Sequence, residues 1–497
     1  MEIINSVIDF LNGIIWSNAL IVLCLVTGLY FSLRTKFLQV RLIKPMVKHM
    51  FEGKDSKQGI SSFQALCTAL AGRVGTGNIA GTATAIYFGG PGALVWMWII
   101  AFLGAASAYM EAALAQVWKT EIDGQYRGGP AYYIEKGMGT RWYAMVFSIS
   151  TLLACGLLLP GVQANSIANA FNNVAGVPNL VSGVVIALVL GLIIFGGIRR
   201  IAKVAEIIVP FMAIIYILMA FVILFVNFDK IGEVFVLIFS SAFGANATYG
   251  GIIGSAVAWG VKRGIYSNEA GQGSAPHAAA AAEVSHPAKQ GLVQAFSVYI
   301  DTLFVCSATG FMILMTDCFN VFNEGTEKFL HIGGNETMQA LAETQTVGPE
   351  FTQAAVSTVV GGFGGWFVAI CLAFFAFTTI MAYYYQAESN VAYIFRHQDS
   401  KMRRTITLIL RLCMIVAVIY STVATATAAW NAGDVGVGLM AWINIIALWI
   451  LQKPALATLK DYEAQRKAGK DPVFEPEKLG IKNAEIWGKI AKRNQVK

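Results

Sequence analysis

The chain has 497 residues, of which 56% are hydrophobic and only 13% are charged, and its mean hydropathy is +0.60. Because soluble domains carry about 25% charged residues, this composition excludes an ordinary soluble enzyme and indicates an integral membrane protein that lies in the lipid bilayer. The net charge of +7 comes without a cluster of basic and aromatic residues, so the chain gives no reason to expect a nucleic-acid partner.

Apolar runs of about 20 residues, the length that crosses a bilayer as a helix, recur along the chain. Eleven runs are found, at about 11–33, 62–88, 92–118, 142–173, 179–198, 204–227, 238–261, 289–316, 361–391, 405–426 and 434–452. The first run follows Glu2 and Asp9 rather than a basic leader, so it is kept as a span. The sequence therefore predicts an all-α integral membrane protein with eleven transmembrane helices.

Lysine and arginine gather in alternate loops. They follow spans one, three, five, seven and nine and enrich the tail from Lys453, whereas the other loops hold only Lys230 and Lys328. Because basic loops stay in the cytoplasm, the amino terminus is predicted outside and the carboxyl terminus in the cytoplasm.

Motifs for enzyme chemistry are absent from the sequence. The five histidines lie in or beside loops, and neither a His-Glu-x-x-His pair nor a Cys-x-x-Cys pair occurs. Ser274 has no span-embedded histidine positioned to activate it, and no phosphate-binding Gly-x-x-x-x-Gly-Lys-Ser/Thr motif is found. We predict neither an enzyme nor a cofactor.

The second span contains Arg73 and Asn78 among four glycines between Ala71 and Thr82. In hydrocarbon every backbone amide and carbonyl must be paired, so such an interruption persists only where the freed groups face protein, water or a solute. A broken helix exposes backbone carbonyls where its first half ends and backbone amides where its second half begins. The carbonyls can bind a cation, and the amides can bind a carboxylate beside it. Gly75, Thr76, Gly77 and Asn78 are therefore candidate substrate-binding residues.

Without the first span, ten spans divide into two sets of five. The second set is predicted to open with a matching interruption at 247–255, which contains Gly250 and Gly251. An odd number of spans in each set makes the two sets inverted repeats, as in many secondary transporters. The predicted domains are 1–60 (first span and basic loop), 61–228 (first repeat), 229–453 (second repeat, with an outer segment at 317–360) and 454–497 (cytoplasmic tail). Close helix packing through Gly-x-x-x-Gly is the alternative explanation of both glycine runs.

Several motifs resemble one family of membrane proteins. They are Ser62–Cys67, Arg73–Gly81, Gly89–Ala93, Trp96–Trp98, Arg127–Pro130, Gln163–Ser166, Gly260–Gly264, Ser267–Gly271 and Phe474–Pro476. Through them the chain resembles the alanine or glycine:cation symporters, also called sodium:alanine symporters, of bacteria and archaea. The resemblance implies the leucine-transporter-like fold, with one accessory helix, a 5+5 inverted repeat and broken core helices 1 and 6, in the cytoplasmic (inner) membrane.

The resemblance also implies one sodium ion as the coupling ion. It would be held by backbone carbonyls of Ala71, Val74 and Phe375 and by the hydroxyls of Thr378 and Thr379. The alternative is that each threonine hydroxyl bonds back to its own helix. Because Arg73 stands where a second sodium would need a small neutral residue, one sodium is expected. The ionic partner of Arg73 stays open among Glu111, Asp301 and Glu388.

For the substrate, amides near Gly75 and Gly77 can receive a carboxylate, as helix amino termini do. Acceptors for the ammonium group are predicted in the side chain of Gln163 and in the Gly250 and Gly251 carbonyls, although Gln163 alternatively bonds a neighbouring helix. Trp366 and Ile370 are four residues apart and therefore lie on one helix face. The family resemblance implies that this face closes the pocket around the substrate side chain. The alternative is that both residues simply pack against other helices.

Together these features predict a sodium-coupled symporter that imports small neutral amino acids, such as alanine or glycine, by alternating access. The alternatives are glutamine as the substrate, proton coupling through Glu111 or Asp301, and a channel whose filter is made by the broken helices.

Overall fold

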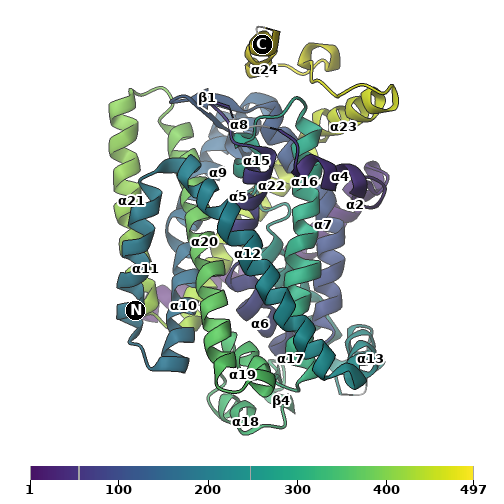
Figure 1. Ribbon diagram of the computed structural model, residues 1–497, viewed down its shortest axis with the longest axis vertical. Coiled ribbons are helices and arrows are strands. Elements are labelled where there is room, and N and C mark those ends of the chain that lie inside the picture. Colours follow the sequence, from purple (N-terminus) through teal and green to yellow (C-terminus); the bar gives the residue numbers. More distant parts are fainter. Residues whose placement is uncertain (1, 54–55, 247, 496–497) are drawn as a thin grey trace.

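The computed structural model describes residues 2–53, 56–246 and 248–495. The described chain is a bundle of helices that mostly run along its long axis (Figure 1). The strands of the described residues form two short hairpins, so the chain is mostly helical, as predicted.

Helix and strand bounds of the first half are α1 (Glu2–Ile15), α2 (Asn18–Arg34), α3 (Leu38–Arg41), α4 (Ile43–Met50), α5 (Ser62–Arg73), η1 (Gly77–Gly81), α6 (Thr82–Gly89), α7 (Ala93–Val117), β1 (Thr120–Ile122), β2 (Gln125–Arg127), α8 (Pro130–Tyr133), η2 (Ile134–Met138), α9 (Arg141–Leu153), η3 (Ala154–Leu158), α10 (Leu159–Ala175), α11 (Asn179–Ile194), α12 (Gly197–Val226) and η4 (Phe228–Lys230). Those of the second half are α13 (Ile231–Ala242), η5 (Gly250–Ile252), α14 (Ile253–Asn268), α15 (Pro276–Ala281), α16 (Pro287–Tyr299), η6 (Ile300–Cys306), α17 (Ser307–Met315), β3 (Asn320–Asn323), β4 (Lys328–Ile332), α18 (Glu336–Glu343), α19 (Pro349–Val360), α20 (Phe363–Ile394), α21 (Ser400–Thr422), α22 (Ala426–Ile450), α23 (Gln452–Lys467), η7 (Pro476–Leu479) and α24 (Ile486–Gln495).

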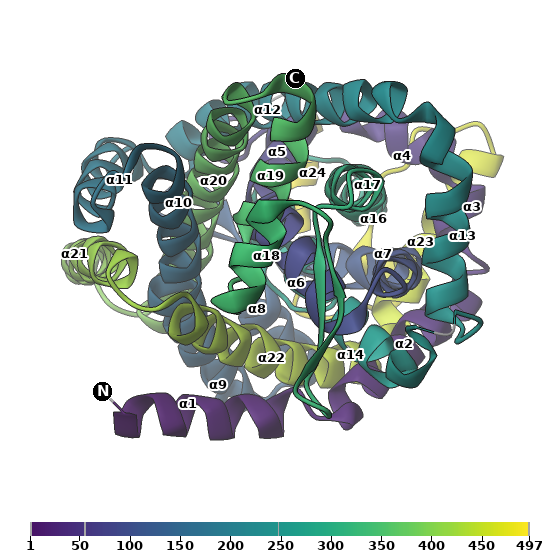
Figure 2. The ribbon, with the colours of Figure 1, turned by 90° about the horizontal axis from the view of Figure 1, so that it is seen from below.

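The two ends of the bundle differ. At one end, here called the tail end, lie α23, α24 and the antiparallel pair β1–β2 (Figure 1). At the other, here called the cap end, the antiparallel pair β3–β4 and helices α18 and α19 lie across the bundle (Figure 2). The predicted outer segment 317–360 thus forms a cap that is partly helical.

Among the described residues, seven helices are long and apolar enough to cross a membrane. An eighth is counted if the bent pair Ser6–Ile15 and Asn18–Arg34, which meet at 40°, is one span. The interrupted helices α5–α6 and α14–α15 are not among these seven, because each of their helical segments is shorter than 18 residues. The number of eleven spans stays a prediction.

The first interruption lies where the sequence predicts it. A capping box at Ser61 and Gln64 begins α5, and the helix ends at Arg73 because Val74 has φ −78° and ψ 89°. Helical backbone resumes at Gly77. The α5–η1–α6 segment is therefore a helix broken at Val74–Thr76.

The interruption predicted at 247–255, of which residue 247 lies outside the described residues, falls on the turn between α13 and α14, whereas another break follows at the far end of α14. Gly250 forms a short turn between α13 and α14 near the cap end, and α14 then continues without a break to Asn268. The break follows there, since Glu269, Gly271 and Gly273 all have positive φ, at 56°, 81° and 90°. Pro276 begins α15, as proline often does at a first helical position.

Candidate functional site

The two broken helices approach each other at their breaks. A Cβ added to Gly77 would lie 3.1 Å from the Cα of Ser267 and 3.2 Å from the ring of Tyr266, at the end of α14. Only a glycine lets the backbones come this close. The first break therefore lies against the last turn of α14, directly before the second break.

Side chains of η1 and of α10 accept hydrogen bonds from two amides of the first break. The amide of Gly75 donates to Asn78 Oδ1 at 2.8 Å, and the amide of Thr76 donates to Gln163 Oε1 at 2.9 Å. Gln163 is buried and belongs to α10. The structure thus brings five predicted substrate residues together, namely Gly75, Thr76, Gly77, Asn78 and Gln163.

Oxygen atoms from α5 and α20 converge on the hydroxyl of Thr379. This oxygen lies 2.8 Å from the carbonyl of Ala71, 3.4 Å from that of Val74 and 3.0 Å from that of Phe375. One hydroxyl proton can satisfy only one of these three carbonyls, so the cluster is rich in acceptors. Neutral oxygens in this number suit a hard cation such as sodium.

The hydroxyl of Thr378 bonds back to its own helix, which is the predicted alternative to sodium binding. Its hydroxyl donates to the carbonyl of Phe375, one turn earlier in α20, at 2.9 Å. Because Thr379 also reaches Phe375, both threonines share one carbonyl of their own helix. Of the two, Thr379 is the one that also contacts α5.

Arg73 is 1% exposed and points to α16. Its Nη1 donates to the carbonyl of Gln294 at 3.2 Å and contacts the hydroxyl of Ser297. Its Nε and Nη2 have no hydrogen-bond partner. Of its predicted partners, Glu388 instead pairs with Arg127 at 2.9 Å, and no carboxylate among the described residues lies within ion-pair distance of Arg73.

Glu111 of α7 holds the backbone of the second break. Its carboxylate accepts the amides of Gly271 at 3.3 Å and Gly273 at 3.1 Å, and it accepts from Asn444 Nδ2 at 2.9 Å. A buried carboxylate with three donors is well compensated. Its role here is to fix the chain between α14 and α15.

Asp301 of η6 joins the two breaks. It accepts from Asn78 Nδ2 at 2.6 Å, from the hydroxyl of Ser267 at 3.0 Å and from the hydroxyl of Thr302 at 2.7 Å. Asn78 and Ser267 belong to the first broken helix and to α14. The carboxylate therefore ties both to the segment α16–η6–α17, which covers the eighth predicted span.

Four other predicted residues lie away from the breaks. Gly250 and Gly251 belong to the short turn near the cap end, where Gly251 is exposed. Trp366 and Ile370 are 41% and 42% exposed. At 100° per residue they occupy the face of α20 opposite Phe375 and Thr379. The structure thus does not bring these four residues to the first break, and their contact with substrate stays a prediction.

A buried ionic cluster lies on the cap side of the breaks. Asp434 of α22 receives two hydrogen bonds from Arg263 of α14, at 2.9 Å and 2.8 Å, and Lys262 lies 2.8 Å away. The guanidinium of Arg263 lies 4.6 Å from the centre of the Trp430 ring. This cluster joins α14 to α22 between the breaks and the cap end.

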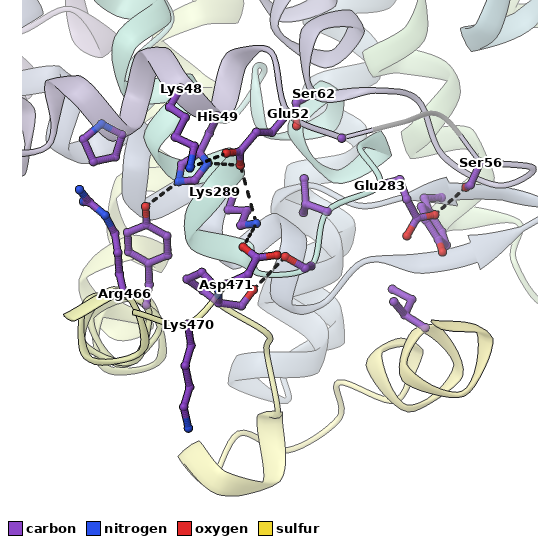
Figure 3. A pocket seen from close by; sticks show the side chains of 18 of the residues that line it. Lys48, His49, Glu52, Ser56, Ser62, Glu283, Lys289, Arg466, Lys470 and Asp471 are labelled. Atoms are coloured by element: carbon purple, nitrogen blue, oxygen red, sulfur yellow. Dashed lines mark hydrogen bonds and ion pairs between the residues drawn. The ribbon is translucent and has the colours of Figure 1, made fainter. Parts of the chain in front are cut away.

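At the tail end, the entry to α5 pairs with the exit from α15. The amide of Ile60 donates to the carbonyl of Ala281 at 3.0 Å, and that of Glu283 donates back to Ile60 at 2.9 Å. A cavity of about 1410 Å³ opens beside this pairing. Figure 3 shows Lys289 of α16 reaching Asp471 of the tail across it, at 2.7 Å.

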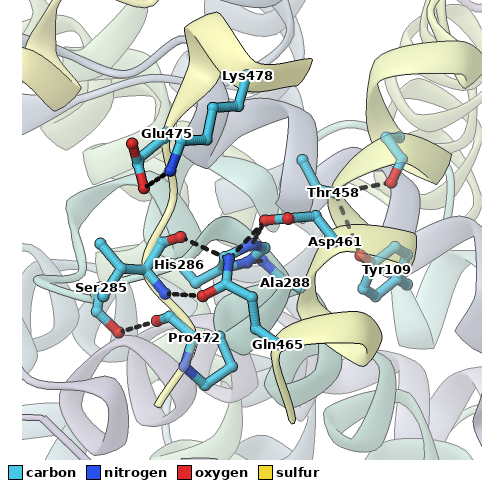
Figure 4. Close-up of polar contacts among 12 residues, drawn as sticks. Tyr109, Ser285, His286, Ala288, Thr458, Asp461, Gln465, Pro472, Glu475 and Lys478 are labelled. Atoms are coloured by element: carbon cyan, nitrogen blue, oxygen red, sulfur yellow. Dashed lines mark hydrogen bonds and ion pairs between the residues drawn. The ribbon is translucent and has the colours of Figure 1, made fainter. Parts of the chain in front are cut away.

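The tail packs onto the bundle through His286, which begins α16. Its Nδ1 accepts the amide of Ala288 at 3.1 Å, and its Nε2 lies 3.1 Å from Asp461 of α23 (Figure 4). Gln465 bonds the same carboxylate at 2.8 Å. The tail is thus attached near the start of α5 and the end of α15, where both broken helices reach the tail end.

Sequence reasoning missed Glu269, the first residue of the second break. It is fully buried beside Gly72 of the first broken helix, yet the sequence motifs gave it no role in the site. The short run Asn268–Ser274 could have indicated the break, because it places a charged residue among glycines, as the first break does with Arg73.

Known proteins resemble the chain over nearly its whole length. The model of the sodium:alanine symporter family matches residues 1–476. YrbD of Bacillus subtilis strain 168 is 57% identical over 480 residues, 96% of each chain. A protein of Bacillus sp. strain PS3 named "Sodium/proton-dependent alanine carrier protein" is 51% identical over 90% of this chain and 98% of its own. "Probable sodium/glutamine symporter GlnT" of Bacillus subtilis is 42% identical over 98% of this chain and 96% of its own.

A solved structure has the same fold. The crystal structure of MhsT in complex with L-phenylalanine matches with a TM-score of 0.55 at 16% identity, covering 82% of this chain and 97% of MhsT. At this identity the match concerns the fold alone.

Proposed function

This chain belongs to the sodium:alanine symporter family, and on that premise we propose that it is a sodium-coupled symporter that imports small neutral amino acids by alternating access. Alanine and glycine are the proposed substrates. The relatives are carriers and symporters by name, which supports a transporter rather than an enzyme.

The observation that carries the sodium proposal is the cluster of oxygens around Thr379. Three backbone carbonyls, of Ala71, Val74 and Phe375, lie within 3.4 Å of one hydroxyl. Sodium would use these oxygens together with the hydroxyl of Thr378. The amides and side chains of Gly75 to Asn78 with Gln163 would receive the amino acid beside it.

The cap end is proposed to face outside and the tail end the cytoplasm of a bacterial or archaeal cell, with eleven spans in the cytoplasmic membrane. The amino terminus would then lie outside. Basic loops support this orientation, because the lysine-rich tail lies at one end. The domain division at 60, 228 and 453 remains part of the proposal, with two inverted repeats meeting at the breaks.

Alternating access needs one barrier on each side of the site. The Arg263–Asp434 cluster would form the outer barrier, and the paired Ile60 and Ala281 segments with the attached tail would form the inner one. Opening either barrier requires breaking buried polar contacts, which substrate and sodium binding would compensate by favouring one state.

The driving force is adequate for import. One charge moved across 100 mV gives about 2.3 kcal/mol, and a tenfold sodium gradient adds about 1.4 kcal/mol. One sodium per amino acid thus permits accumulation by roughly 500-fold.

The test is uptake of radiolabelled alanine into proteoliposomes of the purified protein. We expect accumulation driven by an inward sodium gradient and inhibited by unlabelled glycine or serine. Uptake that is unchanged when potassium replaces sodium, at fixed pH and voltage, contradicts sodium coupling.

Glutamine is the second candidate substrate. Trp366 and Ile370, which were predicted to favour small side chains, lie half-exposed on the far face of α20, and this supports testing a larger substrate. GlnT, 42% identical, is a further reason to test it. Strong glutamine uptake without alanine uptake in the same assay would select this candidate.

A further inference from the structure

The cavity at the tail end has a positively charged lining. Its described lining includes three carboxylates, those of Glu52, Glu283 and Asp471. It also includes six lysine and arginine side chains: Lys44, Lys48, Lys57, Lys289, Arg466 and Lys470. A concave surface with an excess of one charge attracts ligands of the opposite charge, so this cavity favours an anion.

Two of the carboxylates are already paired with lysines of the same cavity. Glu52 lies 3.3 Å from Lys48 Nζ, and Asp471 lies 2.7 Å from Lys289 Nζ (Figure 3). The described residues place no carboxylate within ion-pair distance of three further cations of the lining: Lys44, Arg466 and Lys470. These N–H donors are therefore available to an anionic group that comes from outside the chain.

Helix α4 presents an apolar row beside its lysines. Ile43, Val47 and Phe51 follow one another at intervals of four residues and are 40%, 39% and 70% exposed. At 100° per residue, Lys44 and Lys48 lie at the edge of this row. The helix packs on α16 and lies on the outside of the bundle near the tail end (Figures 1 and 2). An exposed apolar row bordered by lysines is typical of a helix in the membrane–water interface.

The apolar row favours a lipid over a soluble anion as the ligand of this cavity. A soluble anion would occupy the cavity and leave Ile43, Val47 and Phe51 exposed. A phospholipid would cover that row with an acyl chain and bring its phosphate to the adjacent lysines. Phosphate oxygens accept charge-assisted hydrogen bonds from lysine and arginine, which are the donors that line the cavity.

We propose that the tail-end cavity binds the phosphate headgroup of an anionic phospholipid from the adjacent membrane leaflet. Lys44 and Lys48 of α4 hold the headgroup from one side, and Arg466 and Lys470 of the tail hold it from the other. An acyl chain lies along the apolar row of α4. This inference concerns a lipid rather than the transported solute, so it stands or fails separately from the proposed symport.

The bound headgroup would fasten the tail to the bundle. The structure already joins α4 to α23 through His49 Nε2, which lies 2.5 Å from the hydroxyl of Tyr462. A headgroup between the lysines of α4 and the cations of the tail adds a second connection between the same elements. The cavity lies beside the pairing of Ile60 with Ala281, so the lipid stabilises the tail at the proposed inner barrier.

The experiment measures lipid binding to the purified protein in detergent by native mass spectrometry, with the thermal unfolding midpoint of the same samples. The probes are dioleoyl phosphatidylglycerol, which is anionic, dioleoyl phosphatidylcholine, which has the same acyl chains without net charge, and glycerol phosphate, which has no acyl chain. We expect phosphatidylglycerol to bind at least about tenfold more tightly than either of the others. It alone should raise the unfolding midpoint.

The double variant Lys44→Gln with Lys48→Gln removes the basic edge of α4. It should bind phosphatidylglycerol about tenfold more weakly, because each basic residue near a membrane surface adds to the attraction for anionic lipid. The matched control is Lys401→Gln with Arg404→Gln, two exposed residues at the start of α21 that do not line the cavity. The control should bind phosphatidylglycerol as the wild type does.

Three results would overturn the proposal. Equal binding of phosphatidylcholine would show that the acyl chains alone are recognised, and equal binding of glycerol phosphate would assign the cavity to a soluble phosphate. Equal losses in the two double variants would show that the cavity does not hold the lipid. If Lys44→Gln with Lys48→Gln does not fold, as judged by size-exclusion chromatography, Arg466→Gln with Lys470→Gln replaces it with the same expected loss. Because no amino acid is present in this assay, its failure leaves the proposed symport intact.

Discussion

The hydroxyl of Thr379 lies 2.8 Å from the carbonyl oxygen of Ala71, so that a side chain of α20 reaches the last turn of α5. A cation at this point would hold the two helices together, and its departure would free them. This contact would therefore connect occupation of the proposed sodium site to the position of the first broken helix.

Thr379→Val should weaken sodium binding more than alanine binding. The valine keeps the shape but removes the oxygen that faces three carbonyls, so we expect a rise of at least tenfold in the sodium concentration for half-maximal uptake, about 1.4 kcal/mol. The measurement is alanine uptake against sodium concentration. Thr405→Val is the control, since Thr405 is exposed and bonds only its own helix; equal effects of both variants would remove the sodium assignment.

Gly77→Ala should block transport by separating the broken helices. The new methyl group would lie 3.1 Å from the Cα of Ser267, and such overpacking costs about 1–3 kcal/mol. We expect a lower thermal unfolding midpoint and strongly reduced alanine uptake. Gly254→Ala is the matched control, because nothing lies within 4 Å of its added Cβ, and it should be neutral or slightly stabilising; similar losses in both variants would contradict close contact at Gly77.

The first break could be predicted because its signal is local. Arg73, Asn78 and the glycines lie within a dozen residues of an otherwise apolar run, and a bilayer penalises such a stretch unless it lines a site. The same reasoning identified Gln163, a polar side chain in an apolar helix, and the structure brings it to Thr76.

The second break could not be located in this way because distant residues stabilise it. Glu111 and Asn444 hold the backbone of Gly271 and Gly273 from other helices, and neither partner is visible in the local pattern. The denser glycine run at Gly250 and Gly251 drew the prediction instead. Likewise, the spacing of Trp366 and Ile370 fixes a common face of the helix but not the direction in which that face points.

Asp434→Asn should destabilise the protein more than Lys262→Met does. The asparagine leaves Arg263 and Lys262 buried without their counter-charge, and breaking a buried pair in this manner costs about 3–5 kcal/mol. Lys262→Met keeps the two hydrogen bonds from Arg263 to Asp434. The measurement is the thermal unfolding midpoint in detergent, and a larger drop for Lys262→Met would contradict the central role of Asp434.

Acid should loosen the tail through His286. Burial lowers the pKa of the His286 imidazole to about 4, whereas an unfolded histidine has a pKa of about 6.5. Its contribution to stability is thus complete above pH 6.5 and is lost as the pH falls toward 4, because protonation at Nδ1 ends the bond from the Ala288 amide. His286→Gln should therefore reduce the fall in the unfolding midpoint between pH 7.5 and pH 5, while His397→Gln, at an exposed histidine, should leave that fall unchanged. An identical pH dependence in wild type and His286→Gln would mean that the buried imidazole does not control the attachment of α23.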